Sequence, residues 1–310
     1  MPALALRLAA AAGGLLLGAA AFAGTAAGTS TGTAESSGGI TVYTAGDIAR
    51  CAYSDPAWSA AADTARTVAA GLAADPQAVV LTLGDHTYPR GRAKEFTDCY
   101  APTWGKFKDR TWPAPGNHEY YTPKAAPYFA YFGERAGRGY YSLELGSWHI
   151  VSLDSNLAPA EHAAQIEWLR ADLASHPARC TLAFWHHPLY SSGGHGSIPK
   201  MRDAWRLLQQ AGAELVLSGH DHDYERFAPQ DADNKLDRTR GMRQFVVGTG
   251  GAYPTPFLLT VKNSEMRDSG RTGVLKLRLL DGRYEWEFLE SARLTPLGLP
   301  ERDRGGDVCH

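Results

Sequence analysis

The feature that most constrains this 310-residue chain is a recurring pattern in which a β-rich apolar run ends near a potential metal ligand. The runs at residues 40–44, 78–83, 180–185 and 214–217 are followed closely by Asp47, Asp85, His186 and His220. In α/β sheets, the loops at the carboxyl ends of buried strands project side chains into a shared crevice. The pattern therefore predicts that these four side chains meet at one site.

The remaining hydrophobic patterning favours a buried sheet with helices on its faces. Helices are predicted at residues 57–73, 159–175 and 199–211, between the apolar runs. Nearly continuous apolar strands are typical of a sheet that is covered on both sides. Further strands are predicted for a hairpin at 140–145 and 148–153 and for residues 244–247, 273–279 and 284–289.

The start of the chain is typical of an exported protein. Residues 1–23 combine one positive charge, a run of small apolar residues and a closing Ala-Phe-Ala pattern, which together predict a secretory signal peptide. A retained N-terminal anchor is the alternative. The apolar run is short and rich in Ala and Gly, so no stable membrane span is expected after cleavage. Residues 24–39 are a low-complexity Gly/Ser/Thr/Ala linker, which leaves residues 40–310 as one α/β domain.

The charge balance argues against long nucleic acids as partners. The chain has 31 Lys and Arg residues against 33 Asp and Glu residues, and the sequence pI is about 6.6. Binding to a phosphate backbone needs a clustered basic surface. No such basic run occurs, so no nucleic-acid binding surface is evident.

The four cysteines, Cys51, Cys99, Cys180 and Cys309, fit an oxidising compartment. They contain no C-x-x-C pair, so a cysteine zinc site is not expected. Three pairings are possible. We favour Cys51–Cys99 and Cys180–Cys309, because the first pair flanks motifs that must converge and the second would fasten the C-terminus.

The chemistry-bearing residues form an ordered series of motifs. Taken alone, an Asp after a strand can simply cap a helix or form a turn. Here the series is Gly46-Asp47, Gly84-Asp85 with Tyr88, Gly116-Asn117-His118-Glu119, His186, and Gly219-His220-Asp221-His222. This series resembles the calcineurin-like metallophosphoesterases, from about residue 41 to residue 251. The resemblance implies a four-layer α/β/β/α sandwich, in which two mixed sheets are flanked by helices, and makes residues 40–310 the catalytic domain.

Two positions resemble the purple acid phosphatase branch in particular. Many metallophosphoesterases begin with D-x-H, but Ala49 stands two residues after Asp47. Tyr88, three residues after Asp85, stands where purple acid phosphatases carry a phenolate ligand to ferric iron. A core aromatic is the alternative for Tyr88. The missing histidine ligand at Ala49 and the added phenolate ligand at Tyr88 therefore belong to the same metal site.

The resemblance implies two metal ions. Fe(III) would be held by Asp47, Tyr88 and His222, and Zn(II), Fe(II) or Mn(II) by Asn117, His186 and His220. Asp85 would bridge both, because two cations about 3.5–4 Å apart need a shared anion between them. On an extended chain, His220 and His222 would point to opposite sides and reach different metals.

Several neighbouring residues take supporting or catalytic roles by the same resemblance. His118 matches the histidine that protonates the leaving alcohol. His195 matches a phosphate-contacting histidine, with a solvated loop residue as the alternative; Gly196 follows it where plant enzymes often have a second histidine. Their neighbours are given plainer roles from the residues themselves. Asp221 and Asp223 are expected to orient loops, His187 to pack or to support the ligands, Glu119 to support the ligands rather than to react, and Asp154 to form a turn.

The predicted function is a secreted dinuclear phosphoesterase that hydrolyses small phosphate monoesters through attack by a metal-bound hydroxide. A secreted phosphodiesterase or nucleotidase on the same metal core is one alternative. A non-catalytic surface binding module with a vestigial metal site is the other, although the ligand set is complete. The oligomeric state has no signature in the sequence.

Overall fold

The computed structural model describes residues 38–52, 55–293 and 303–310. The predicted signal peptide and nearly all of the predicted linker lie outside these residues. Within the described part of the chain, no helix is long and apolar enough to cross a membrane.

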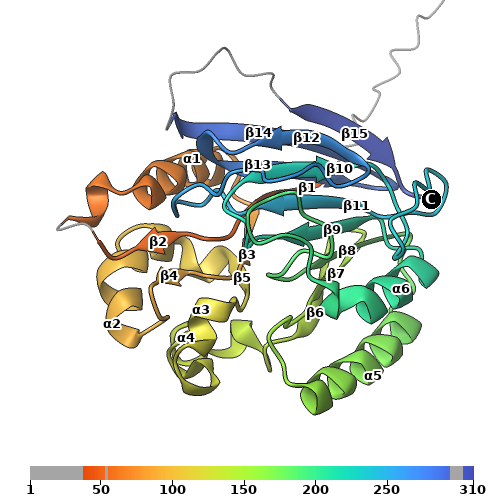
Figure 1. Ribbon diagram of the computed structural model, residues 1–310, viewed down its shortest axis with the longest axis horizontal. Helices are drawn as coiled ribbons and strands as arrows, with labels where there is room; N and C mark the ends of the chain where they lie inside the picture. The colour runs from red at the N-terminus through yellow and green to blue at the C-terminus, as the bar shows by residue number, and fades with distance from the viewer. Residues whose placement is uncertain (1–37, 53–54, 294–302) are drawn as a thin grey trace, which may run out of the picture. The chain divides into compact units, whose positions relative to one another are not determined.

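The first sheet contains the strands that lead to Asp47 and Asp85. Its strand order is β15 (Arg304–Val308), β14 (Arg283–Arg293), β13 (Arg271–Leu280), β1 (Ile40–Ala45), β3 (Val79–Leu83) and β5 (Thr111–Ala114). The strands β1, β3 and β5 are parallel, and β13 pairs antiparallel with β1. The sheet is therefore mixed (Figure 1).

The second sheet contains the strands that lead to His186 and His220. Its strand order is β12 (Ser264–Asp268), β10 (Tyr224–Phe227), β11 (Arg243–Val247), β9 (Leu215–Ser218), β8 (Cys180–Phe184), β7 (Trp148–Ser152) and β6 (Tyr141–Leu145). The strands β7, β8, β9 and β11 are parallel, and β6, β10 and β12 run antiparallel to their neighbours. A short parallel pair, β2 (Ala49–Arg50) and β4 (Thr87–Tyr88), lies next to the site.

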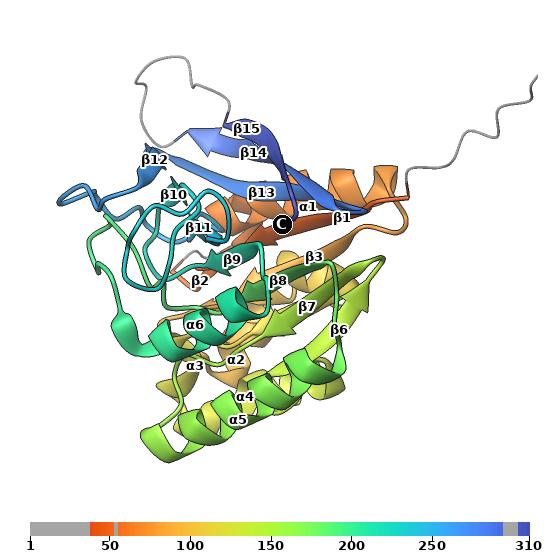
Figure 2. The same ribbon diagram turned by 90° about the vertical axis from the view of Figure 1, so that its right-hand side faces the viewer.

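Helices cover the outer faces of both sheets. Helix α1 (Ala60–Ala74) packs on β13 and β14, and α5 (Pro159–Ser175) and α6 (Arg202–Gln210) pack on the second sheet (Figure 2). Alternating side chains divide between two cores, as the strand geometry requires. Ile150 and Leu182 lie in the core between the sheets, whereas Val151 and Ala183 face the helices. The predicted α/β/β/α sandwich is therefore confirmed.

Short helical segments cover the region beside β5. They are α2 (Ala93–Glu95), η2 (Phe96–Tyr100), η3 (Trp104–Arg110), α3 (Asn117–Tyr120), η4 (Pro123–Ala125), α4 (Ala126–Phe132) and η5 (Gly133–Ala136), whereas η1 (Pro56–Trp58) lies against α1. Their buried aromatic rings surround His86, including Tyr100, Tyr128 and Phe132 at centroid distances of 4.8 to 5.5 Å. This packing fixes the loop that carries Asp85.

Most predicted elements are present, with two corrections at helix starts. The helix predicted from residue 57 begins at Ala60, because Ser59 caps it by accepting from the backbone N–H of Ala62. The helix predicted at 199–211 divides into a 3₁₀ turn, η6 (Pro199–Met201), and α6. The strands β5, β10, β12 and β15 were not predicted.

Both predicted disulfides are confirmed. Cys51 joins Cys99, and Cys180 joins Cys309. The first connects the loop after β2 to η2, and the second fastens the segment after β15 to the start of β8. Closing loops of 48 and 129 residues reduces the entropy of the unfolded chain.

Candidate metal centre

The four predicted strand-end residues lie at one edge of the sandwich. Asp47 follows β1, Asp85 follows β3, His186 follows β8 and His220 follows β9. Asp47, Asp85 and His220 adopt positive φ values of 60°, 50° and 73°. Residues other than glycine rarely occupy this left-handed region, and strain of this kind gathers at functional sites. The chain turns sharply here to aim each side chain inward.

The backbone at His220 corrects one prediction. The reasoning that assigned His220 and His222 to different metals assumed an extended chain, but β9 ends at Ser218 and His220 is left-handed. The turn is held by a hydrogen bond from the backbone N–H of His220 to Asp47 Oδ2, at 2.8 Å. Both rings still face the centre, because of this turn rather than strand alternation.

The first group of candidate ligands is Asp47, Tyr88 and His222. The Tyr88 hydroxyl lies 2.8 Å from Asp47 Oδ1 and 3.0 Å from His222 Nε2. His222 Nε2 is 3.4 Å from Asp47 Oδ1. Three donor atoms from three separate segments of the chain, one of them the strand β4, therefore surround one point, as a small metal ion requires.

The second group is Asn117, His186 and His220. Asn117 Oδ1 lies 3.0 Å from His186 Nε2 and 3.1 Å from His220 Nδ1, and the two ring nitrogens are 3.2 Å apart. The Asn117 amide donates to the Tyr121 hydroxyl at 3.2 Å, which turns the amide oxygen toward the histidines. This group forms a second cluster of nitrogen and oxygen donors.

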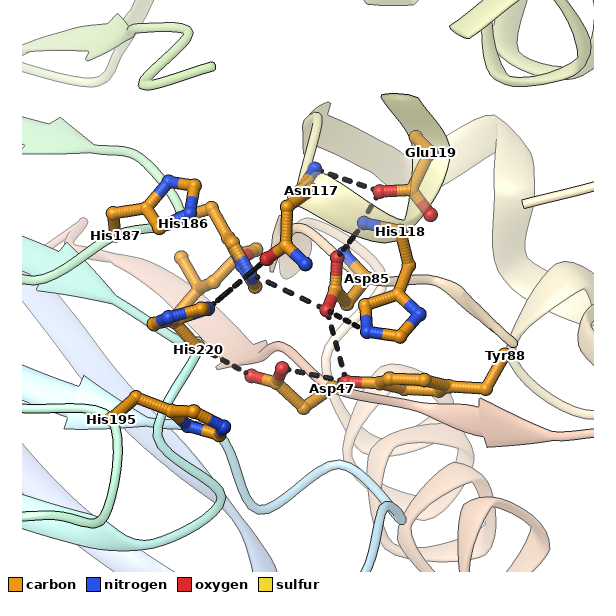
Figure 3. Close-up of polar contacts among 12 residues, drawn as sticks. Asp47, Asp85, Tyr88, Asn117, His118, Glu119, His186, His187, His195 and His220 are labelled. Atoms are coloured by element: carbon orange, nitrogen blue, oxygen red, sulfur yellow. Dashed lines mark hydrogen bonds and ion pairs between the residues drawn. The ribbon is translucent and has the colours of Figure 1, made fainter. Parts of the chain in front are cut away.

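Asp85 lies between the two groups (Figure 3). Its Oδ2 atom is 3.1 Å from the Tyr88 hydroxyl and 3.4 Å from His186 Nε2. Its Oδ1 atom accepts from the backbone N–H of His118 at 2.9 Å, which fixes the carboxylate plane. One oxygen therefore faces a member of each ligand group, which is the geometry of a bridging ligand.

Backbone carbonyls orient the histidine rings. His186 Nδ1 lies 2.7 Å from the oxygen of Leu83, and His222 Nδ1 lies 2.6 Å from the oxygen of Tyr253. A carbonyl partner makes Nδ1 the donor, so Nε2 keeps a free lone pair. Both Nε2 atoms point into the centre, as metal ligation requires.

The charge distribution favours cations at this centre. Asp47 and Asp85 are buried, and among the described residues their ion-pair partners are histidines, with no Lys or Arg. Burial raises the pKa of Asp85, but the charges of His186 and His118 outweigh burial and lower it. Burial together with Asp47 and Asp85 raises the pKa of Tyr88 well above its usual value. A phenolate at Tyr88 therefore needs a strongly charged cation beside it, and hard oxygen donors with imidazoles fit such an ion.

The two predicted catalytic histidines lie on either side of the ligand groups. His118 Nδ1 is 2.7 Å from the Pro89 oxygen, and its Nε2 is 3.7 Å from Asp85 Oδ2. His195 is 45% exposed, and its ring lies 4.7 Å from that of His220. A hydrogen bond to Asp221 raises the pKa of His195. Both imidazoles can therefore donate to a ligand bound between them.

Carboxylates behind the site hold its loops in place. Glu119 accepts three backbone N–H groups, those of Asp85, His86 and Gly116, at 2.7 to 2.9 Å. Asp221 accepts from the backbone N–H of His195 at 2.7 Å and from the Ser191 hydroxyl at 2.5 Å. These contacts agree with the supporting roles predicted for Glu119 and Asp221.

Replacing Glu119 by alanine is expected to destabilise the fold by about 3 kcal/mol or more. Three buried N–H groups would lose their acceptor, and each unsatisfied donor costs about 1–3 kcal/mol. Urea denaturation of the purified protein measures the change. Glu161→Ala is the control, because Glu161 accepts a single exposed N–H at the start of α5 and should cost less than about 1 kcal/mol. Equal losses for both variants would contradict the role assigned to Glu119.

His187 was predicted to pack or to support the ligands from behind, and its ring lies beside the second ligand group. Its ring is 4.5 Å from that of His220, and it belongs to a group with His186 and His220 whose donor atoms lie within 4.8 Å of one another. Its Nδ1 is 2.7 Å from the Ser155 hydroxyl. Burial and the charges of His186 and His220 lower the pKa of His187 to about 2, which favours the neutral ring.

A cavity of about 390 Å³ opens beside the second ligand group. It is lined by Asn117, Tyr120, Tyr121, Ser155, Asn156, His187, Ile198 and Lys200. Tyr120 is held by a hydrogen bond from its hydroxyl to Asp154, at 2.5 Å. The cavity offers aromatic, amide and cationic contacts to a group bound next to the metal centre, and none of these contacts was readable from sequence.

Together, the mixed-sheet sandwich and the strand-end cluster define an α/β protein with a candidate metal centre. The chain belongs to the calcineurin-like phosphoesterase family, whose model matches residues 40–224. This match covers every candidate ligand.

Among characterised proteins, the chain is similar to plant purple acid phosphatases. Purple acid phosphatase 21 of Arabidopsis thaliana is 34% identical over 160 residues, which cover 48% of this chain and 36% of that protein. Purple acid phosphatase 15 of the same plant is 32% identical over 213 residues, or 56% of this chain and 40% of that protein. The chain therefore spans less than half the length of these relatives.

Solved structures share the fold at low identity. The purple acid phosphatase PPD1 of yellow lupin seeds superposes with a TM-score of 0.65 at 20% identity, over 82% of this chain and 52% of that one. GAP50, the anchor in the inner membrane complex of Plasmodium, gives 0.65 at 13% identity, over 88% and 89%. At these identities the likeness concerns the fold alone.

Proposed function

We propose that this chain is a metal-dependent phosphoesterase that hydrolyses small phosphate monoesters at a centre of two metal ions. The observation that carries the proposal is the shared position of Asp85 Oδ2, 3.1 Å from Tyr88 of one ligand group and 3.4 Å from His186 of the other. Fe(III) at the Tyr88 group and Zn(II), Fe(II) or Mn(II) at the Asn117 group suit the donors. Similarity to plant purple acid phosphatases supports the same chemistry.

When bound, a metal pair supplies a nucleophile from water near neutral pH and neutralises phosphoryl oxygens. The protein's own residues do the rest. Asp85 sets the separation of the two ligand groups. His195 donates to a phosphoryl oxygen from the exposed rim, with its ring fixed by Asp221. His118 donates a proton from Nε2 to the leaving alcohol, with Nδ1 held by Pro89.

The proposal includes export from the cell. The Cys51–Cys99 and Cys180–Cys309 disulfides persist in an oxidising compartment, and the predicted signal peptide at residues 1–23 would direct the chain there. N-terminal sequencing of protein recovered from the culture medium tests this. A mature N-terminus near residue 24 is expected, and protein found only in the cell with residues 1–23 retained would contradict export.

Parallel rates on four substrates, p-nitrophenyl phosphate, bis-p-nitrophenyl phosphate, an alkyl phosphate and a nucleotide, test the activity. We expect faster hydrolysis of p-nitrophenyl phosphate than of bis-p-nitrophenyl phosphate, together with activity on an alkyl phosphate. A preference for the diester would favour the phosphodiesterase alternative, and a preference for nucleotides would favour a nucleotidase. A protein that holds metal but hydrolyses none of them would favour the non-catalytic binding module.

Replacing Tyr88 by phenylalanine is expected to abolish visible absorption while leaving metal in the second group. The wild-type protein should show a broad visible band from tyrosinate bound to Fe(III), and the substitution removes the only phenol oxygen of the first group. Absorption spectra with metal content by mass spectrometry measure both. Tyr128→Phe is the control, because its hydroxyl donates to the backbone oxygen of Pro113 and contacts no candidate ligand. A colourless wild type with two metals would retain the phosphoesterase and exclude ferric iron.

A further inference from the structure

A second cluster of histidine and carboxylate side chains lies far from the candidate metal centre in the fold. His149 is the second residue of β7, and Asp172 and His176 lie at the C-terminal end of α5. The candidate centre follows the carboxyl ends of β8 and β9, which run parallel to β7. His149 therefore sits at the opposite edge of the same sheet. Figure 2 shows α5 running alongside β6 and β7.

The donor atoms of this cluster already face one another. His149 Nε2 is 2.8 Å from Asp172 Oδ2, and His176 Nδ1 is 3.3 Å from Asp172 Oδ1. One candidate donor atom from each of the three residues lies within 4.8 Å of the other two. The imidazole rings of His149 and His176 are stacked, with an interplanar angle of 11°. Asp172 and His176 are four residues apart at the end of a helix, which places them on one face.

Neighbouring groups hold the cluster in this arrangement. Glu144 Oε1, from β6, lies 2.7 Å from His149 Nδ1. The Ser142 hydroxyl donates to Asp172 Oδ1 at 2.6 Å. A carboxylate on the far ring nitrogen fixes the tautomer of a metal-binding histidine and increases the basicity of the other nitrogen. Glu144 stands in that position, and it leaves Nε2 of His149 to face Asp172 and His176.

We propose that His149, Asp172 and His176 form a separate zinc site, with Glu144 as the residue that orients His149. Two imidazoles and one carboxylate are borderline ligands that zinc accepts, and water would complete the coordination. The site joins β7 to the end of α5. Its role is therefore structural, because it fastens the last turn of that helix to the sheet.

The observed donor distances need only small adjustment if Asp172 binds through both oxygens, Oδ2 beside His149 and Oδ1 beside His176. The His176 ring must also turn out of its stack on His149, because a metal lies in the plane of each imidazole that binds it. Zinc bonds of ~2.0–2.2 Å in tetrahedral geometry separate ligand atoms by about 3.4 Å. The His176–Asp172 pair already meets this at 3.3 Å, and the His149–Asp172 pair would open from 2.8 Å as zinc replaces the shared hydrogen. His176 Nδ1 would give up its contact with the Asp172 backbone oxygen, at 2.9 Å. Because His176 is 48% exposed, water can replace that contact.

The same side chains also form ion pairs without metal. The amount of zinc bound per chain distinguishes a zinc site from an ion-pair network. Wild-type protein, His176→Ala and His162→Ala are equilibrated with zinc chloride, separated from free zinc by gel filtration, and analysed for zinc per chain. His162 is the matched control: it lies on the same helix and contacts one carboxylate, Asp203, at 3.0 Å. All three proteins keep the strand-end centre, so any zinc bound there is the same in each. The difference in zinc per chain therefore does not depend on the proposed function.

We expect wild type and His162→Ala to hold equal zinc and His176→Ala to hold about one ion per chain less. Zinc should also raise the thermal midpoint of wild type more than that of His176→Ala. A second variant, Glu144→Gln, should weaken zinc binding about 10–100-fold through loss of the orienting carboxylate. Equal zinc in wild type and His176→Ala, or unchanged affinity in Glu144→Gln, would overturn the proposal and leave an ion-pair network.

Discussion

The Asp85→Asn variant is expected to lose about 10³-fold or more in kcat/KM for p-nitrophenyl phosphate and at least one metal ion per chain. The asparagine can keep the hydrogen bond from the backbone N–H of His118, now 2.9 Å from Oδ1. It removes the negative charge that lies 3.1 Å from Tyr88 and 3.4 Å from His186. Without a shared anion, two cations at such a separation repel each other. The loss of a single aligned hydrogen-bond donor in a catalytic site already costs about 10²–10³-fold.

Asp154→Asn is the matched control for this experiment. Asp154 is also a fully buried carboxylate that follows a strand. It accepts hydrogen bonds from Tyr120 and Asn156 instead of facing the ligand groups. Burial raises the pKa of Asp154, so the neutral amide should be tolerated, with less than about a tenfold loss. An Asp85→Asn protein that keeps both metals and nearly full kcat/KM would contradict the bridging role.

The position of the centre could be predicted because it depends on a simple rule. Buried apolar strands can be recognised from four to six consecutive residues, and parallel strands bring their carboxyl ends to one edge. Asp47 and His220 were therefore placed correctly although they are far apart in sequence, and the backbone N–H of His220 now contacts Asp47 at 2.8 Å. The Cys51–Cys99 pairing followed from the same convergence, whereas Cys180–Cys309 was favoured because it would fasten the C-terminus.

The orientation of the candidate ligand side chains could not be predicted from the strand pattern. The left-handed backbone at Asp47, Asp85 and His220 is unusual for these residue types and leaves no pattern in the sequence. It depends on contacts made after folding, such as the three N–H groups that Glu119 accepts. The extended chain assumed for His220 and His222 was wrong for this reason.

Two of the strands that were not predicted, β12 and β15, have sequences unlike those of buried strands. β12 contains alternating charged residues, and β15 includes two glycines and is exposed along its length. Both lie at sheet edges, where exposed and charged residues are common. Their position depends on tertiary contacts: Arg226, next to β12, binds Asp303, next to β15, at 2.9 Å. Such contacts cannot be recognised from the hydrophobic periodicity of the sequence.

His118→Ala is expected to separate substrates by their leaving groups. An alkoxide is a strong base and needs a proton as it departs, so the rate on an alkyl phosphate should fall about 10²–10⁴-fold. Nitrophenolate is a weak base, so the rate on p-nitrophenyl phosphate should fall much less. His195→Ala is the control: its ring lies on the exposed side of His220 and His222, so its loss should affect both esters alike. The ratio of the two kcat values is the measurement. If His118→Ala also lowers both rates equally, the histidine holds the substrate or Asp85 in place, and the leaving-group proton comes from another donor.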